Sequence, residues 1–244
     1  MIFPFRDHNP SERVPYVTIA LIILNVLIFL GSYAAQSERA IAEIFFHYGL
    51  VPARISAGEG YVTALSSMFL HSGFMHLAGN MLFLWIYGDN LEDKLGHVPF
   101  LIFYLLCGIA AGLAQFASEP SSMIPMVGAS GAIAGVMGGY LLLFPKARVD
   151  VFVFFIVFFR IFPIPAWITL GFWFAAQLFN GFNAMAGTGG VAHWAHAGGF
   201  VAGFALMLPM WLTLGGTGFW QRTHGHPDHP ETQYGRSNIP TVRR

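Results

Sequence analysis

Six apolar runs, each about as long as a membrane-spanning helix, constrain what this chain can fold into. They lie near residues 16–35, 72–89, 98–117, 126–144, 164–182 and 190–214. A helix needs roughly 20 predominantly apolar residues to cross a bilayer. Charged residues make up 10% of the 244 residues, against about 25% in soluble domains. The sequence therefore predicts an all-α membrane protein with six transmembrane helices and no soluble domain.

Two further segments decide the topology. Residues 36–70 mix charged with aromatic and apolar residues, and they are predicted to form a long membrane-associated loop between the first two helices. Residues 147–163 are very apolar but carry Arg148, Asp150 and Arg160, and an arginine at mid-bilayer costs several kcal/mol. We interpret this second segment as interfacial. The alternative, a separate span, would invert the topology of everything after it.

The chain is expected to comprise an N-terminal segment (1–15), a six-helix domain (16–214) and a flexible polar tail (215–244). Lys and Arg in short loops set the orientation, because they favour the cytoplasmic side. With the N-terminus inside, the outer loops hold Arg39 and Arg54. The inner side then holds Arg6, Arg13, Lys94, Lys146, Arg148, Arg160 and the arginines of the tail. We therefore expect a multi-pass protein of the cell membrane, as in the bacterial cytoplasmic membrane, with both termini cytoplasmic.

Three other features carry weaker signals. The first apolar run resembles a signal peptide, since it follows Arg6 and Arg13 and ends in Ser32-Tyr33-Ala34, but its length favours an uncleaved span. The formal net charge is zero, so no nucleic-acid partner is predicted. The tail sequence HGHPDH at 224–229 could bind a metal, and a flexible polar tail is the favoured interpretation. No metal and no cofactor are predicted.

Polar side chains inside three of the runs are functional candidates by default. They are His71, His76, Asn80, Ser130, His193 and His196. An isolated serine in a membrane helix more often bonds its own backbone or packs at a helix contact. The spacing around these residues therefore has to indicate whether they serve packing or catalysis.

Glycine spacing predicts close contact between the helices that carry Ser130 and His196. Small residues at intervals of three or four make one side of each helix nearly bare backbone. These glycines are Gly131 and Gly135 in the fourth run and Gly199 and Gly203 in the sixth. Contact between the two faces would bring the His196 imidazole within about 3 Å of the Ser130 hydroxyl, the reach of a general base.

Hydrogen-bond donors for a developing negative charge are also available. His76 and Asn80 are four residues apart and project from one helix face. Backbone N–H groups near Gly128 to Ser130 add donors if a helix begins there. The spans hold no acidic residue available to orient His196, so a Ser-His dyad is favoured over a triad. The polar groups together predict acyl transfer.

Three short motifs follow one another along the chain. HLAGN at 76–80 has the form H-x-x-x-N, GASG at 128–131 the form G-x-S-G, and AHAGGFVAG at 195–203 the form A-H-x-x-G-x-x-x-G. Their order and spacing resemble the rhomboid family of intramembrane serine proteases, over about residues 16–213. One departure is the stretch Gly58-Glu59-Gly60-Tyr61-Val62, where many rhomboids have a Trp-Arg pair. The family's anchoring of that loop is therefore not carried over.

The resemblance implies a six-helix rhomboid-like bundle with Ser130 as nucleophile and His196 as general base. It implies an oxyanion hole made by His76, Asn80 and the Ser130 backbone amide. Gly128 is expected to support helix packing beside the glycines named above. The implied substrates are transmembrane segments of other proteins, cleaved near the outer side of the bilayer. No oligomeric state is predicted.

Supporting roles and alternative functions remain open. His71 is assigned a structural role, and His193 lies three residues before the matching histidine. The fifth helix, Ala166 to Asn180, is expected to move so that a substrate can approach laterally. The alternatives are a non-catalytic rhomboid-like binder of membrane proteins and a transporter lined by histidines.

Overall fold

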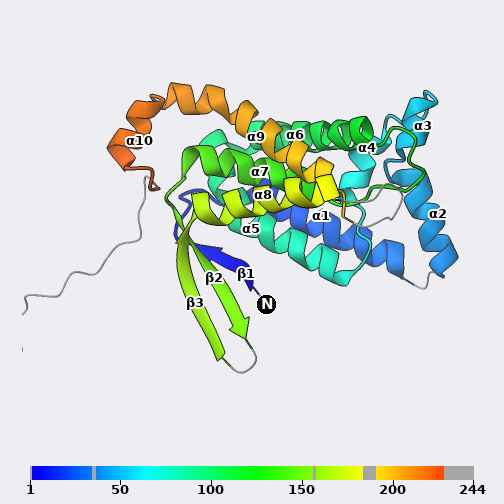
Figure 1. Cartoon of the computed structure of the whole chain (residues 1–244), viewed down its shortest axis with the longest axis horizontal. Helices are drawn as coiled ribbons and strands as arrows, with labels where there is room; N and C mark the ends of the chain where they lie inside the picture. The colour runs from blue at the N-terminus through cyan, green and yellow to red at the C-terminus, as the bar shows by residue number, and fades with distance from the viewer. Residues whose placement is uncertain (1, 35–36, 156–157, 184–190, 228–244) are drawn as a thin grey trace, which may run out of the picture.

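The computed structural model describes residues 2–34, 37–155, 158–183 and 191–227, and within them the chain is mostly helical (Figure 1). The long helices of this described part form the body of the molecule. They are α1 (Tyr16–Tyr33), α5 (Phe74–Leu95), α6 (His97–Ser118), α7 (Ser130–Leu143), α8 (Ala166–Asn183) and α9 (His193–Thr213). These helices coincide with the six predicted apolar runs, to within a few residues at most ends. Among the described residues, α1, α6 and α9 are long and apolar enough to cross a membrane.

The segment expected as a long loop folds largely into short helices. They are α2 (Glu38–Tyr48), α3 (Pro52–Ser56), α4 (Thr63–Ser66) and the 3₁₀ turn η1 (Ser67–Phe69). Local caps explain part of this structure, because the Ser37 hydroxyl accepts a hydrogen bond from the Ala40 N–H at 3.3 Å and a proline opens α3. Leu50 and Met126 exchange two backbone hydrogen bonds of 3.0 and 2.8 Å. This contact ties the segment to the chain just before α7.

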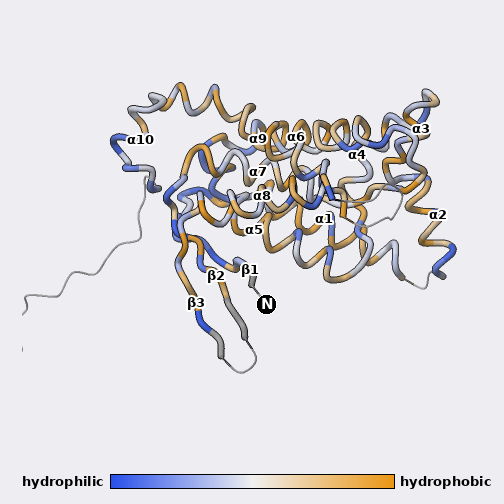
Figure 2. The backbone as a smooth tube through the Cα atoms, viewed as in Figure 1, coloured by the Kyte–Doolittle hydropathy of each residue, from blue (hydrophilic) through white to orange (hydrophobic). Residues whose placement is uncertain are grey.

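Helix α7 occupies the centre of the body, in contact with α5, α6, α8 and α9. Nearly all of its residues are buried, and many of them are glycine or alanine. Small side chains let the neighbouring helices approach its backbone closely. Figure 2 shows that hydrophobic residues follow the long helices, whereas hydrophilic stretches gather near α10 and where the strands leave the body.

The apolar segment 147–163 forms a β-hairpin rather than a helix. Its strands are β2 (Arg148–Phe155) and β3 (Phe158–Pro165), and β1 (Ile2–Asp7) pairs with β2 in an antiparallel sheet of order β1-β2-β3. Aromatic and β-branched residues favour paired strands. The alternative of a separate spanning helix at 147–163 is therefore wrong. Figure 1 shows the hairpin projecting from the helical body.

Charged and polar contacts anchor the N-terminal strand. The Arg6 guanidinium donates to Asp150 on β2 at 2.8 Å, and the His8 ring nitrogen Nε2 also lies 2.8 Å from the same carboxylate. The Tyr140 hydroxyl on α7 donates to the Asp7 carboxyl at 2.7 Å. Residues 2–15 therefore form part of the fold, which the sequence interpretation did not predict.

Asp7 makes the stability of this anchor depend on pH. Burial raises the pKa of its carboxyl to about 8, although the hydrogen bond from Tyr140 acts in the opposite direction. An aspartate in the unfolded chain titrates near a pKa of about 4. Between these two values the folded protein keeps a proton that the unfolded chain releases, so stability falls as pH rises through this window.

Asp7→Asn is expected to remove this pH dependence while keeping an acceptor for Tyr140. The melting temperature of the variant minus that of wild type should be larger at pH 8 than at pH 5. The control is Glu43→Gln, because Glu43 is an exposed acid on α2. Equal differences from wild type at both pH values would show that Asp7 is not protonated in the folded protein.

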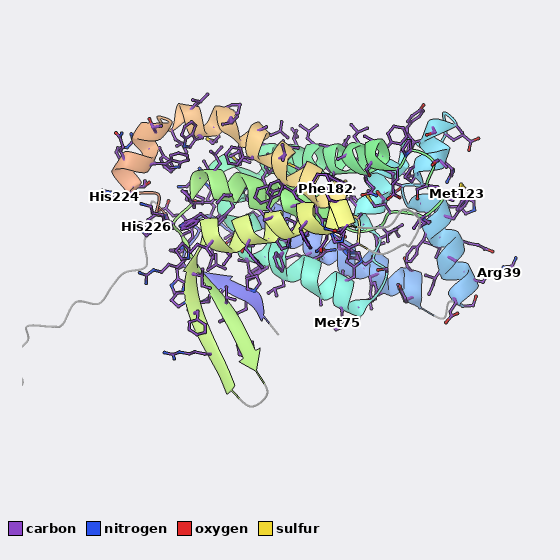
Figure 3. All side chains as sticks on the ribbon, viewed as in Figure 1. Arg39, Met75, Met123, Phe182, His224 and His226 are labelled. Carbon is purple, nitrogen blue, oxygen red and sulfur yellow. The ribbon has the colours of Figure 1, made fainter. Side chains whose placement is uncertain are left out.

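The chain continues after α9 into a further helix, α10 (Thr217–Thr223). The Trp220 indole N–H donates to the Leu142 carbonyl at 3.0 Å, which ties α10 to the end of α7. The expected flexible tail thus begins with an ordered helix. Figure 3 places His224 and His226 beside α10, at the opposite end of the molecule from Arg39 on α2. The remainder of the tail, 228–244, lies outside the described residues.

Candidate active site

Ser130 is the first residue of α7. A residue at this position has a backbone N–H without an intrahelical acceptor. Gly128, two residues earlier, has a φ of +130°, a conformation that favours glycine. A Cβ on Gly128 would lie 2.8 Å from the His76 ring. Gly128 therefore lies where the serine loop approaches the His76 ring.

The glycine-bearing faces of α7 and α9 lie against each other. A Cβ on Gly199 would overlap the backbone of Gly131, and one on Gly203 would overlap the backbone of Gly135. The two helix backbones can approach this closely because neither face carries side chains. The approach brings His196 Nε2 to 2.7 Å from Ser130 Oγ, within hydrogen-bond distance.

A glutamine on α8 contacts the ring nitrogen of His196 that does not face Ser130. The Gln177 amide oxygen Oε1 lies 2.9 Å from His196 Nδ1. A carbonyl oxygen accepts hydrogen bonds and does not donate, so Nδ1 is the donor and Nε2 is free to accept from the Ser130 hydroxyl. The sequence interpretation missed Gln177. The available signal was a strongly polar side chain in the middle of the fifth apolar run.

His76 and Asn80 lie one turn apart on α5, and both line the same cavity as Ser130. His76 Nδ1 lies 2.9 Å from the Ser72 hydroxyl and 3.4 Å from the Ser72 backbone N–H. Because His76 Nδ1 accepts from Ser72, the ring proton of His76 is on Nε2. The Asn80 Nδ2 group is buried and has no hydrogen-bond partner among the described residues. Both side chains thus have a donor available.

The other two histidines lie next to these groups. The buried His71 ring packs edge-on against the His76 ring, with centroids 5.2 Å apart. Within the described part of the chain neither ring nitrogen of His71 has a hydrogen-bond partner. His193 Nδ1 lies 2.9 Å from Gln177 Oε1, the same oxygen that His196 contacts.

These groups surround a cavity of about 630 Å³. Its lining includes Ser130, His196, His76 and Asn80, together with apolar side chains from α2, α5, α6, α7 and α8. The volume falls within the usual range for small-molecule or peptide side-chain sites. The cavity therefore has room for a polypeptide segment beside Ser130.

Comparison with known proteins relates the chain to one family. Residues 58–213 match the family model of the Rhomboid domain. "Rhomboid protein 1, mitochondrial" of Saccharomyces cerevisiae is 33% identical over 155 residues, which cover 59% of this chain and 42% of the yeast protein. "Rhomboid protease GluP" of Bacillus subtilis is 33% identical over 134 residues, or 54% of this chain and 25% of that protein.

A plant relative extends the match. "RHOMBOID-like protein 4" of Arabidopsis thaliana is 30% identical over 185 residues, which cover 73% of this chain and 43% of the plant protein. The chain spans less than two thirds of the length of these relatives. The family model nevertheless covers more than half of the chain. The chain is therefore a membrane protein of the rhomboid family.

Proposed function

We propose that this chain is a serine endopeptidase that hydrolyses peptide bonds in or near transmembrane segments of other membrane proteins. The observation that carries the proposal is the 2.7 Å hydrogen bond between Ser130 Oγ and His196 Nε2. The cavity around this pair also contains the donors of His76 and Asn80. One bacterial relative is named as a rhomboid protease, which points to the same activity.

The proposed reaction has two stages. His196 Nε2 takes the hydroxyl proton while Ser130 Oγ attacks the scissile carbonyl carbon. The protonated imidazole then gives this proton to the leaving amine as the C–N bond breaks, which leaves an acyl ester on Ser130. Water attacks the ester, with His196 again accepting a proton, and the acid product departs as Ser130 regains its hydrogen.

The oxyanion that forms in each stage needs donors already in place. His76 Nε2, Asn80 Nδ2 and the Ser130 backbone N–H are the proposed donors. Preorganised donors in a site shielded from water typically contribute more to the rate than any other single factor. Asn80 fits this role because its buried Nδ2 lacks a partner within the described residues.

We propose that all six long helices cross the membrane, with the sheet on the cytoplasmic side. Basic residues next to the sheet include Arg6, Lys146 and Arg148, whereas Arg39 lies on α2 at the other end of the molecule (Figure 3). Basic loops favour the cytoplasm. Since α7 begins at Ser130 and ends near the sheet, Ser130 would lie toward the outer side.

A substrate segment is proposed to enter the cavity beside helix α8. The outer surface of this helix carries exposed large apolar side chains, as expected for contact with lipid. They are Trp167, Ile168, Phe172, Phe179 and Phe182. Its buried side chains are few and mostly small or aliphatic: Ala166, Leu170, Gln177 and Gly181. A helix with so little buried surface can be displaced at low cost, so a substrate segment would reach the cavity laterally beside α8.

The proposal is tested by labelling the detergent-solubilised chain with a fluorophosphonate and mapping the labelled peptide. This reagent requires no known substrate, because it reacts with an activated serine. We expect the label on Ser130 in wild type and none in Ser130→Ala. In His196→Ala the rate should fall on the order of 10⁴-fold, the scale of losing a catalytic base.

Thermal melting of each variant shows whether it is folded. A folded wild-type protein that takes no label would contradict the proposal and favour the non-catalytic binder or the transporter. A label on another residue would assign the nucleophile elsewhere.

A further inference from the structure

We propose that Gln177 is a positioning residue for the Ser130–His196 pair, holding His196 in the tautomer that can accept the serine proton. This inference rests on the proposed function and deepens it, because it assigns a third residue to the same site. The sequence favoured a dyad, since the spans offer no acidic partner for His196. A neutral amide on α8 takes the place where other serine proteases have an aspartate.

The geometry around Gln177 is specific. Its amide oxygen accepts hydrogen bonds from His196 Nδ1 and His193 Nδ1, each at 2.9 Å. A carbonyl oxygen has two lone pairs, so one oxygen can satisfy both donors. The Gln177 side chain is itself buried, with 9% of its surface exposed. Water therefore competes little for this oxygen.

The consequence for catalysis follows from the chemistry of imidazole. A neutral histidine carries its proton on one nitrogen and accepts at the other. If Nε2 of His196 held the proton, it would point an N–H at Ser130 and could not take the hydroxyl proton. Gln177 excludes this tautomer by requiring a proton on Nδ1. After proton transfer, the same bond stabilises the imidazolium.

Helix α8 also holds the ring of His196 from the side. The Trp173 ring, one turn before Gln177, packs against the His196 ring with centroids 5.7 Å apart. Ser130 belongs to α7 and His196 to α9, so the arrangement needs three helices. His196 keeps its orientation and tautomer while α8 lies against α9. Displacement of α8 would remove both contacts to the His196 ring.

The experiment compares Gln177→Leu and Gln177→Glu in the full chain, purified in detergent. The first readout is the second-order rate of fluorophosphonate labelling at Ser130. The second is the ¹⁵N signals of the His196 ring, which distinguish a protonated from an unprotonated nitrogen. The matched control is Gln115→Leu on α6, because the Gln115 amide oxygen accepts from the Ala195 backbone N–H at 3.3 Å and bonds no imidazole within the described part of the chain.

We expect Gln177→Leu to label about 10- to 100-fold more slowly, the range for losing a hydrogen bond to a group that becomes charged. Its His196 signals should change from the Nδ1–H tautomer to a mixture. Gln177→Glu restores an acceptor and should label at close to the wild-type rate. Gln115→Leu should leave both the rate and the ring signals unchanged.

Several results would overturn the assignment. One is an unchanged labelling rate in folded Gln177→Leu, and another is an equal loss in Gln115→Leu. If Gln177→Leu does not fold, the wild-type spectrum still decides, because a proton on His196 Nε2 contradicts the proposal. Absence of labelling in wild type would contradict the protease activity but not the Gln177 contact, because the ring signals of His196 report that contact independently.

Discussion

Replacing Gly203 by alanine is expected to disrupt the helical core and to abolish labelling of Ser130. Gly203 lies two turns beyond His196 on α9 and takes no part in the proposed chemistry. Its added Cβ would overlap the backbone of Gly135, including the carbonyl group and Cα. Backbone cannot change rotamer as a side chain can, so α7 and α9 must separate.

The expected cost exceeds that of ordinary overpacking. Extra methyl groups in cores where side chains can adjust cost about 1–3 kcal/mol, and here we expect at least about 3 kcal/mol. For a chain of this size that loss corresponds to a fall in melting temperature of roughly 6–12 °C or more. Separation of the helices would also pull His196 away from Ser130.

Gly171→Ala provides the matched control. Gly171 lies on α8, and an added Cβ there would meet no described atom within 4 Å. Alanine is the better helix former by about 1 kcal/mol, so stability should stay the same or rise. Thermal melting and labelling of the two variants side by side would decide the matter. Equal melting temperatures would mean that α7 and α9 can accommodate a methyl group at Gly203 without loss of stability.

The positions of the long helices could be predicted because apolar length and helical structure are directly linked in a membrane. An apolar run of about 20 residues has to bond its backbone internally, and a helix does so without any partner. The sheet could not be predicted in the same way. Strand β3 directly follows its partner β2, but β1 comes from residues 2–7, about 140 positions away from β2 in the chain, and no local pattern records such a pairing.

The pairing of Ser130 with His196 was also predictable. Glycine spacing and the three motifs each pointed to it, and the helix contact that they require is present. The partner of His196 Nδ1 was not predictable from spacing within one helix, because Gln177 reaches it from α8. The spans offer no acid to orient His196, and an amide oxygen occupies that place instead. Contacts between three helices depend on packing, which single-helix periodicity does not encode.

Replacing Asn80 by leucine is expected to slow labelling of Ser130 by about 100- to 1000-fold without loss of stability. Removing one donor from an oxyanion hole typically costs this much in rate. The structural cost should be small or favourable, because the buried Nδ2 group of Asn80 has no partner among the described residues. Replacing an unsatisfied buried polar group by an apolar one is nearly neutral or stabilising. Slower labelling together with unchanged or higher stability is the result expected for a group kept for function at the expense of stability.

Asn25→Leu separates this effect from a general response to losing a buried amide. Asn25 is fully buried on α1, and its Nδ2 donates to the Leu21 carbonyl at 2.8 Å. It lies outside the cavity around Ser130, so the variant should label at the wild-type rate even if its melting temperature changes. The labelling rate and the melting temperature are measured for both variants. If Asn80→Leu loses rate only in proportion to lost stability, or labels as fast as wild type, Asn80 is a packing residue and the oxyanion would depend on His76 and the Ser130 backbone N–H.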